Sequence, residues 1–309
     1  MMDQEEGDQM GGKTRKNVFK ESHCAPGDKQ VMGSCLDEKL IRKIGKIVNR
    51  MRKKDTSLPE INCSDHPEKI HGCICKILKE ITGCSSEACW LKVKTLMKYL
   101  GKDKNKFKDS FKPVMPDEWL KDFNAWLGTD DIEKCLNQHQ KADKAFYFYG
   151  AEPIDFSDCS VSNLCSFDMK KHLDRGQHKI GVVFNTDPHN KPGEHWMSLY
   201  MDLSGTNLEG IPGIYFFDSY GHKPCSRVQK LIDKVQDQGK KYNNPIKYFY
   251  NDKKYQNKDA QCGMYSIHFI KEMIKELPFK QFLKSGLSDK KMISIRDDYF
   301  ISPVDISMN

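Results

Sequence analysis

The chain has 309 residues, with 50 lysines and arginines against 43 aspartates and glutamates, for a formal net charge of +7. The length allows one large domain or a catalytic domain with a smaller one, and the lysines are too widely spread to require a nucleic-acid partner. No apolar run is long enough to cross a bilayer, and residues 1–16 lack the apolar segment of a signal peptide. We therefore expect a soluble protein without a membrane partner, used inside a cell.

Residues 1–33 are polar and show no periodicity, which predicts a disordered tail. Residues 34–140 have helical spacing of apolar residues and predict a Cys-rich helical arm domain. Ser34 is the expected cap of its first helix, over residues 35–54, and Gly83 and Gly101 are the expected ends of the next two. Further short helices are predicted over 117–128 and 130–142.

The arm also holds a cluster of residue types that bind zinc: Cys63, Cys73, Cys75, Cys84, Cys89, His66 and His71. Their spacing, C-x-C and C-x4-C, does not match two C-x2-C knuckles, so we expect buried thiols and no metal. The chain has twelve cysteines and no export signal, and we expect them to be reduced. A Cys84–Cys89 disulfide is conceivable only in an oxidised particle.

Residues 141–309 change in composition and predict an α+β domain. The segments rich in aromatic and β-branched residues predict strands over 145–150, 179–187, 194–203, 213–221 and 246–252. Several are almost continuously apolar, which is typical of strands buried on both faces. An amphipathic helix is predicted over 223–239, and another helix begins at Cys262.

Cys262 is the candidate nucleophile of this domain. It opens the run CGMYSIHFIKEMI, whose apolar residues predict a buried helix, so its sulfur would lie at the positive end of the helix dipole. A helix N-terminus and a nearby imidazolium both favour the reactive thiolate. Taken alone, a cysteine before an apolar helix is more often a packing residue.

Three further polar residues complete the hypothesis of a cysteine nucleophile. Two lie at the ends of predicted strands, and the third lies in the loop before Cys262. His195 would take the thiol proton and return it to the leaving amine, and Asp218 would orient the imidazole. Gln256, six positions before Cys262, would stabilise the oxyanion together with the Cys262 backbone N–H. Each has an ordinary alternative on its own: a surface histidine, a turn aspartate and a solvated glutamine.

The ordered set EHW, YFFDS and QNKDAQCGMYS resembles the ubiquitin-like-protein proteases and the adenovirus proteinase. Within that group, TGCSSEACWL and VVFNTDPHNKPGEHW are similar to the polyprotein-processing proteases of large nucleocytoplasmic DNA viruses, of the African swine fever virus type. The resemblance implies a papain-like or adenain-like α+β fold with a central mixed sheet, preceded by a helical arm. It also implies a cysteine endopeptidase that needs no cofactor and cleaves after Gly-Gly in viral structural polyproteins, through a thioester acyl-enzyme.

The same resemblance gives Trp196 the role of a wall in the narrow tunnel that admits only glycine, although a strand tryptophan is often only a core residue. The chain departs from the swine fever type in having Asp218 in place of Asn. It departs from the cellular enzymes in having Gln261 directly before the nucleophile, where they usually have Asp. The second departure weakens the case for specificity toward SUMO.

Two other functions stay open on the sequence. The chain could be a deubiquitinating or deSUMOylating enzyme, since those substrates also end in Gly-Gly, or an inactive adaptor that binds Gly-Gly tails. The expected partner is thus a protein with a Gly-Gly motif, a viral polyprotein or a ubiquitin-like protein. The expected location is the host cytoplasm and virion for a viral enzyme, and otherwise the cytoplasm or nucleus; the oligomeric state is open.

Overall fold

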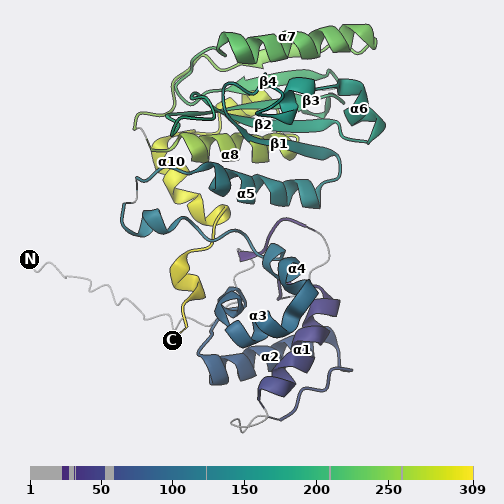
Figure 1. Cartoon of the computed structure of the whole chain (residues 1–309), viewed down its shortest axis with the longest axis vertical. Coiled ribbons are helices and arrows are strands. Elements are labelled where there is room, and N and C mark those ends of the chain that lie inside the picture. Colours follow the sequence, from purple (N-terminus) through teal and green to yellow (C-terminus); the bar gives the residue numbers. More distant parts are fainter. Residues whose placement is uncertain are drawn as a thin grey trace, which may run out of the picture.

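The structure is a computed structural model that describes residues 23–27, 31, 33–52, 59–122, 124–208, 210–258 and 260–308. It has two parts, a helical arm formed by α1 to α4 and a layered domain built on a five-stranded sheet (Figure 1). Within these ranges, no helix is long and apolar enough to span a membrane.

The arm contains four α-helices: α1 (Glu38–Met51), α2 (Pro67–Thr82), α3 (Lys94–Leu100) and α4 (Lys104–Asp109). Two short 3-10 helices join them, η2 (Ala88–Lys92) and η3 (Gly101–Asp103). Gly83 ends α2 in the left-handed conformation, with φ of 76°, as its residue type predicts. The predicted cap of α1 is corrected: the Asp37 side chain, not Ser34, accepts the Leu40 N–H at 2.8 Å.

The sheet has the strand order β1-β2-β3-β4-β5, and every predicted strand is present. The strands are β1 (Phe146–Glu152), β2 (Lys179–Asn185), β3 (Trp196–Asp202), β4 (Gly213–Phe217) and β5 (Lys247–Tyr250). The two outer pairs, β1 with β2 and β4 with β5, are parallel, whereas β2, β3 and β4 pair antiparallel. The sheet is therefore mixed, as the α+β prediction requires.

Helices cover both faces of the sheet, which explains why its central strands are continuously apolar. One face carries α5 (Thr129–Ala142), α8 (Cys262–Ile274), α9 (Phe279–Leu283) and α10 (Asp289–Ser294). The other carries α6 (Met169–Asp174) and α7 (Ser226–Lys241) (Figure 1). The remaining 3-10 helices are η4 (Asp117–Leu120), η5 (Asn163–Ser166), η6 (Thr206–Leu208), η7 (Arg296–Asp298) and η8 (Pro303–Ile306).

The arm and the layered domain each have a hydrophobic core, and the residues in these two cores do not separate at the predicted boundary near residue 140. Trp119, Leu127 and the apolar residues of α5 belong to the core under the sheet, so the layered domain begins before α5. At the other end, Ile301 and Ile306 lie in the arm core. The predicted helix over 117–128 is only the short η4, and the described residues that follow it up to α5 form no helix or strand.

The expectation that all twelve cysteines are reduced is wrong, because six of them form disulfides. Disulfides join Cys24 to Cys35, Cys84 to Cys89 and Cys159 to Cys165. The Cys84–Cys89 bridge removes two of the candidate zinc ligands, and no group of three or more metal-binding side chains occurs among the residues that the structure describes.

The predicted disordered tail lies mostly outside the described residues, which begin at His23. From there the chain is placed on the arm: Cys24 is bonded to Cys35, and the Ala25 N–H donates to the Ser110 carbonyl at 3.0 Å. The end of the predicted tail is therefore part of the folded arm.

Candidate active site

Cys262 is the first residue of α8, and it is only 1% exposed. The helix begins directly before it, where the Tyr265 N–H donates to the Gln261 carbonyl at 3.0 Å. Because the N–H groups of the first turn have no partner within the helix, they and the helix dipole favour negative charge on a sulfur placed there. This is the position that the sequence predicts for the nucleophile.

His195 and Asp218 meet because β3 and β4 are antiparallel. His195 directly precedes β3 and Asp218 directly follows β4, and the register pairs Ser198 with Phe217. Two residues far apart in sequence therefore lie at the same edge of the sheet, with His195 Nε2 2.7 Å from Asp218 Oδ1. His195 also hydrogen-bonds to Cys262, so three of the four predicted residues form one connected group.

The charge of the imidazole follows from these contacts. Burial alone would lower the pKa of His195, but its hydrogen bonds with Asp218 and Cys262, and their negative charges, raise that pKa to about 9. At neutral pH the arrangement therefore favours an imidazolium beside the sulfur. Such a pair can attack a carbonyl carbon and then give a proton to the leaving amine.

Asp218 is fixed by partners that the sequence did not indicate. Asn251, which follows β5, donates to the Asp218 backbone carbonyl at 2.7 Å and accepts the Asp218 N–H at 2.9 Å. The Tyr220 N–H donates to Asp218 Oδ1 at 3.0 Å, and the Tyr220 ring packs against the His195 ring with centroids 4.7 Å apart. These contacts hold both the carboxylate and the plane of the imidazole.

Gln256 is fully buried and lies beside the same group. Its Oε1 accepts the Ser219 hydroxyl at 2.7 Å, and its Nε2 donates to the Lys258 carbonyl at 2.6 Å. Nε2 also lies 3.3 Å from the Tyr220 hydroxyl. The carboxamide is thus joined to the His195 side of the site through Tyr220. Its role as an oxyanion donor stays a prediction.

Trp196, the predicted tunnel wall, is 6% exposed and its indole N–H donates to the Leu127 carbonyl at 2.9 Å. Leu127 also limits the space at the nucleophile, since a Cβ added to Gly263 would lie 2.9 Å from Leu127 Cβ. The segment before α5 therefore packs against both the indole and the first turn of α8. Sequence reasoning assigned this segment to the arm and missed it.

Trp119, in η4, is connected through Arg296 to Gln261, the residue directly before Cys262. Arg296, from η7, is buried and donates to Gln261 Oε1 at 3.1 Å, while its guanidinium lies 3.8 Å from the Trp119 ring centre. Gln261 is the N-cap of α8, so this chain of contacts fixes the start of the helix. The only sequence signals were an unusual Gln before Cys262 and a tryptophan in η4.

Comparison with known proteins finds a family that is similar to the domain that holds this site. A model of the C-terminal catalytic domain of the Ulp1 protease family matches residues 178–304, which include His195, Asp218, Gln256 and Cys262. This part of the chain is therefore similar to the catalytic domain of the Ulp1 proteases. Its fold, a mixed five-stranded sheet flanked by helices and preceded by a helical region, is the fold that the sequence predicts.

The chain as a whole is also similar to viral proteins. Over 176 residues it is 33% identical to a protein of Acanthamoeba polyphaga mimivirus that is named as a thiol protease; the match covers 57% of this chain and 56% of that protein. A cysteine protease of African swine fever virus is 25% identical over 283 residues, with 80% of this chain and 97% of that protein covered. The crystal structure of the swine fever protease superimposes with a TM-score of 0.65 at 20% identity, covering 91% of this chain and 96% of the other.

Proposed function

We propose that this chain is a cysteine endopeptidase of the Ulp1 family that cleaves after Gly-Gly in structural polyproteins of a virus, through a thioester acyl-enzyme. The observation that carries the proposal is the hydrogen-bonded group of His195, Asp218 and Cys262 at the head of α8. The Cys262 thiolate attacks the carbonyl carbon and the His195 imidazolium protonates the leaving amine. Water then hydrolyses the thioester with His195 as the base.

The narrow surroundings of Cys262 support a preference for glycine. Trp196 is fixed by the Leu127 carbonyl, and Leu127 leaves no space for a side chain at Gly263. We infer that a substrate passes beside this fixed indole, where a residue without a side chain fits best. The match to the swine fever protease over 97% of its length, arm included, further supports an enzyme of that type acting in the host cytoplasm and the virion.

A deubiquitinating or deSUMOylating function is the second candidate, since several swine fever relatives are named SUMO-1 cysteine protease. Gly-Gly-X peptides and the conjugates of ubiquitin and SUMO, offered to the same full-length enzyme, separate the two. We expect the peptides to be cleaved after the second glycine, and replacement of either glycine by alanine to prevent cleavage. Rapid turnover of the conjugates with the peptides left intact would overturn the polyprotein assignment.

The nucleophile is tested against a matched free cysteine. Cys262→Ala should abolish cleavage without unfolding the domain, whereas Cys225→Ala, at an exposed free thiol, should leave the rate unchanged. Full activity of the Cys262→Ala enzyme would contradict the mechanism. Binding of Gly-Gly tails without cleavage by the unsubstituted protein would identify an inactive adaptor.

Gln256→Ala tests the oxyanion donor. Loss of one donor in comparable sites costs about 10²–10³-fold in kcat, and we expect a loss of that size with KM nearly unchanged. Ser219→Ala removes the hydroxyl that fixes the carboxamide, so it should give a smaller loss in the same direction. A Gln256→Ala enzyme with normal kcat would show that the carboxamide is structural.

A further inference from the structure

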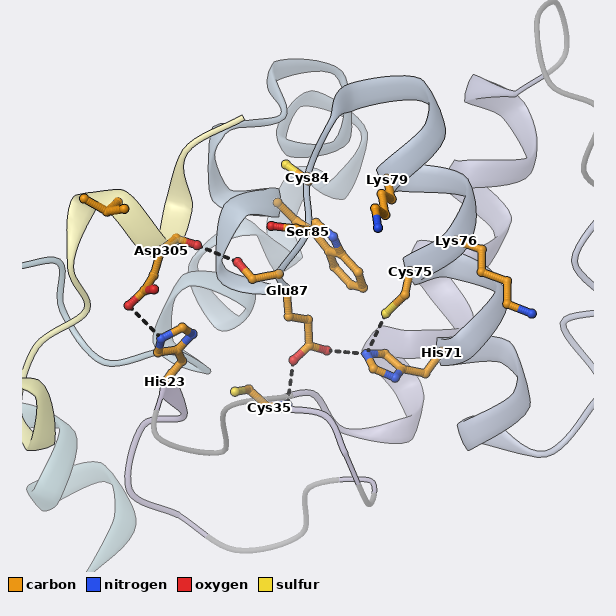
Figure 2. Close-up of a pocket in the computed structure, with 13 residues that line it drawn as sticks. His23, Cys35, His71, Cys75, Lys76, Lys79, Cys84, Ser85, Glu87 and Asp305 are labelled. Carbon is orange, nitrogen blue, oxygen red and sulfur yellow. Dashed lines mark hydrogen bonds and ion pairs between the residues drawn. The ribbon is translucent and has the colours of Figure 1, made fainter. Parts of the chain in front are cut away.

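The arm contains a cavity of about 400 Å³ that the protease mechanism does not use. Its walls come from α2, the loop before η2, the N-terminal segment at His23 and Cys35, and the C-terminal segment at Val304 and Asp305 (Figure 2). We call it the arm pocket. It lies in the part of the chain outside the matched catalytic domain, apart from its C-terminal edge.

One face of α2 presents a row of three functional side chains to the arm pocket. His71, Cys75 and Lys79 are spaced four residues apart, which places them one above another on a helix. Figure 2 shows all three directed toward the middle of the pocket, whereas the side chain of Lys76, which also lines the pocket, extends away from these three. Cys75 is a free thiol and only partly buried, so a small molecule in the pocket can reach its sulfur.

The histidine in this row is held as a cation by a buried carboxylate. Glu87 is 5% exposed, and its Oε1 lies 3.0 Å from His71 Nε2. Its other oxygen accepts the Cys35 N–H at 2.8 Å, and Ser34 donates its hydroxyl to the same carboxylate. Burial alone would lower the pKa of His71, but hydrogen bonds with Cys75 and Glu87 raise it to about 10. An imidazolium therefore lies beside the Cys75 sulfur, 3.5 Å from it.

The geometry of this group differs from that of the protease site. At the protease site Asp218 occupies Nε2 of His195, which leaves the other ring nitrogen for Cys262. In the arm pocket the same Nε2 of His71 faces both Glu87 and Cys75. An imidazolium fixed in this way attracts a thiolate but cannot act as the base that would release an acyl group to water. The group is therefore suited to a single covalent reaction at Cys75 and not to turnover.

We propose that Cys75 is a modification site that forms a mixed disulfide with an anionic low-molecular-weight disulfide, the class that includes oxidised glutathione. The Cys75 sulfur bonds to one sulfur of the reagent, the S–S bond of the reagent breaks, and its second sulfur leaves as a thiolate. That thiolate takes up one proton for the proton lost by Cys75, so the products are Cys75–S–SR and RSH. The Cys75 thiol is oxidised and the small disulfide is reduced.

Charge and redox setting both support this class of reagent. His71 and Lys79 place two cations on the same face of α2 as the sulfur, which favours binding of a reagent that carries carboxylates. The three disulfides of the chain are favoured where thiols are oxidised, and of the two proposed locations this fits the virion. A free thiol kept in a cavity under those conditions meets small disulfides.

The test is site-resolved labelling of the full-length protein with oxidised glutathione at neutral pH, followed by peptide mass spectrometry. Cys73 is the matched control, because it is a partly buried free thiol on the same helix. We expect the initial rate at Cys75 to exceed that at Cys73 by about tenfold or more, and the excess to disappear in denaturant. Equal rates at the two thiols in the folded protein would overturn the proposal.

Two lysine variants test whether the arm pocket binds the anionic reagent or whether the Cys75 thiol is simply accessible. Lys79→Gln should slow modification of Cys75 by oxidised glutathione about two- to fivefold, and leave its reaction with the uncharged hydroxyethyl disulfide unchanged. Lys76→Gln, at a lining residue whose side chain extends away from Cys75, should change neither rate. Equal effects of the two variants would refute a bound anion in the arm pocket.

His71→Gln should slow the reaction of Cys75 with both reagents about tenfold, with the Cys73 rate as the measure of an intact helix. If Cys73 instead reacts faster in His71→Gln, the substitution has loosened the arm. The comparison of Lys79→Gln with Lys76→Gln then decides whether the arm pocket binds the anionic reagent. Cleavage of Gly-Gly peptides is not needed for any of these readouts. Failure of the proposed protease specificity would therefore leave the result intact.

Discussion

The contact between His195 and Asp218 determines the charge of the active site. Because that contact and the hydrogen bond with Cys262 raise the pKa of His195 to about 9, the imidazolium persists well above neutral pH. The folded-state pKa lies above the ordinary value of 6.5. The stabilisation from the charged histidine is therefore complete below about pH 6.5 and is lost as the pH rises through about 9.

This titration predicts the alkaline limb of the pH profile. We expect kcat/KM to fall as the pH rises through about 9, because neutral His195 can no longer protonate the leaving amine. Asp218→Asn removes the negative charge beside the imidazole, so the pKa of His195 should fall and the limb should move to lower pH. Peptide cleavage measured across neutral and alkaline pH checks this.

His222→Gln is the control for the pH experiment. Its imidazole is 72% exposed and lies 3.2 Å from Asp218 Oδ2, whereas His195 contacts Oδ1, so His222 is adjacent to the site on the other carboxylate oxygen. We expect this variant to keep the alkaline limb in place. A limb that stays fixed in Asp218→Asn would mean that a group other than His195 controls it.

At the residue scale the sequence predicted four side chains that lie near one another in the structure, but not the residues that hold them in place. His195, Asp218, Gln256 and Cys262 could be predicted because their types, order and positions at element ends form a recognisable pattern. Asn251 had no such signal: it follows a short edge strand, and its contacts with Asp218 exist only once β4 and β5 pair.

Among the elements, the segment between η4 and α5 was the hardest to predict. Its composition resembles a short amphipathic helix of the arm, but its described residues form no helix, and Leu127 packs on the first turn of α8. Trp119 packs against Arg296, and Leu127 packs against Gly263. Both partners lie far away in the sequence. Local periodicity carries no information on such contacts, whereas the strands, with their strong aromatic and β-branched composition, were all predicted.

Gly263→Ala tests whether this segment fixes the nucleophile. The added Cβ would lie 2.9 Å from Leu127 Cβ, so Leu127 or the first turn of α8 must shift. We expect a loss of about 1–3 kcal/mol in the free energy of unfolding from overpacking, and a drop in kcat from displacement of Cys262. Denaturant unfolding and peptide cleavage measure the two effects.

Leu127→Gly in the Gly263→Ala background should restore part of the loss in kcat, because it removes the Leu127 Cβ that lies 2.9 Å from the added Cβ. Gly72→Ala provides the matched control, since Gly72 lies in α2 with no atom within 4 Å of an added Cβ. It should stabilise the protein by about 0.4–1 kcal/mol through lower chain entropy of the unfolded state. Equal behaviour of the two glycine variants would contradict the role of Leu127.

At the scale of the whole molecule, the chain returns to its beginning. After α10 it leaves the layered domain, and the last described residues pack on the arm, where Ile301 and Ile306 enter the arm core (Figure 1). Ser86 donates to the Asp305 carbonyl at 2.7 Å, and His23 lies 3.2 Å from the Asp305 carboxylate. The order of elements along the chain gave no indication of this return, because a short 3-10 helix has no periodic pattern.

The return of the chain makes the arm depend on the C-terminal segment for its stability. Ile306 is 2% exposed in the arm core, whereas Val304, two residues earlier in η8, is 72% exposed. Ile306→Ala leaves a cavity among the arm residues, so we expect it to lower the free energy of unfolding of the arm by about 2–5 kcal/mol. Val304→Ala should change it by no more than about 0.5 kcal/mol.

Chemical denaturation followed by the fluorescence of Trp90, which is buried in the arm core, measures this difference. If the arm and the layered domain unfold as one unit, the loss of peptide cleavage in denaturant should shift in Ile306→Ala together with the Trp90 fluorescence transition. If only the arm transition moves, the C-terminal segment stabilises the arm alone. An unchanged Trp90 transition in Ile306→Ala would show that the C-terminal segment does not stabilise the arm.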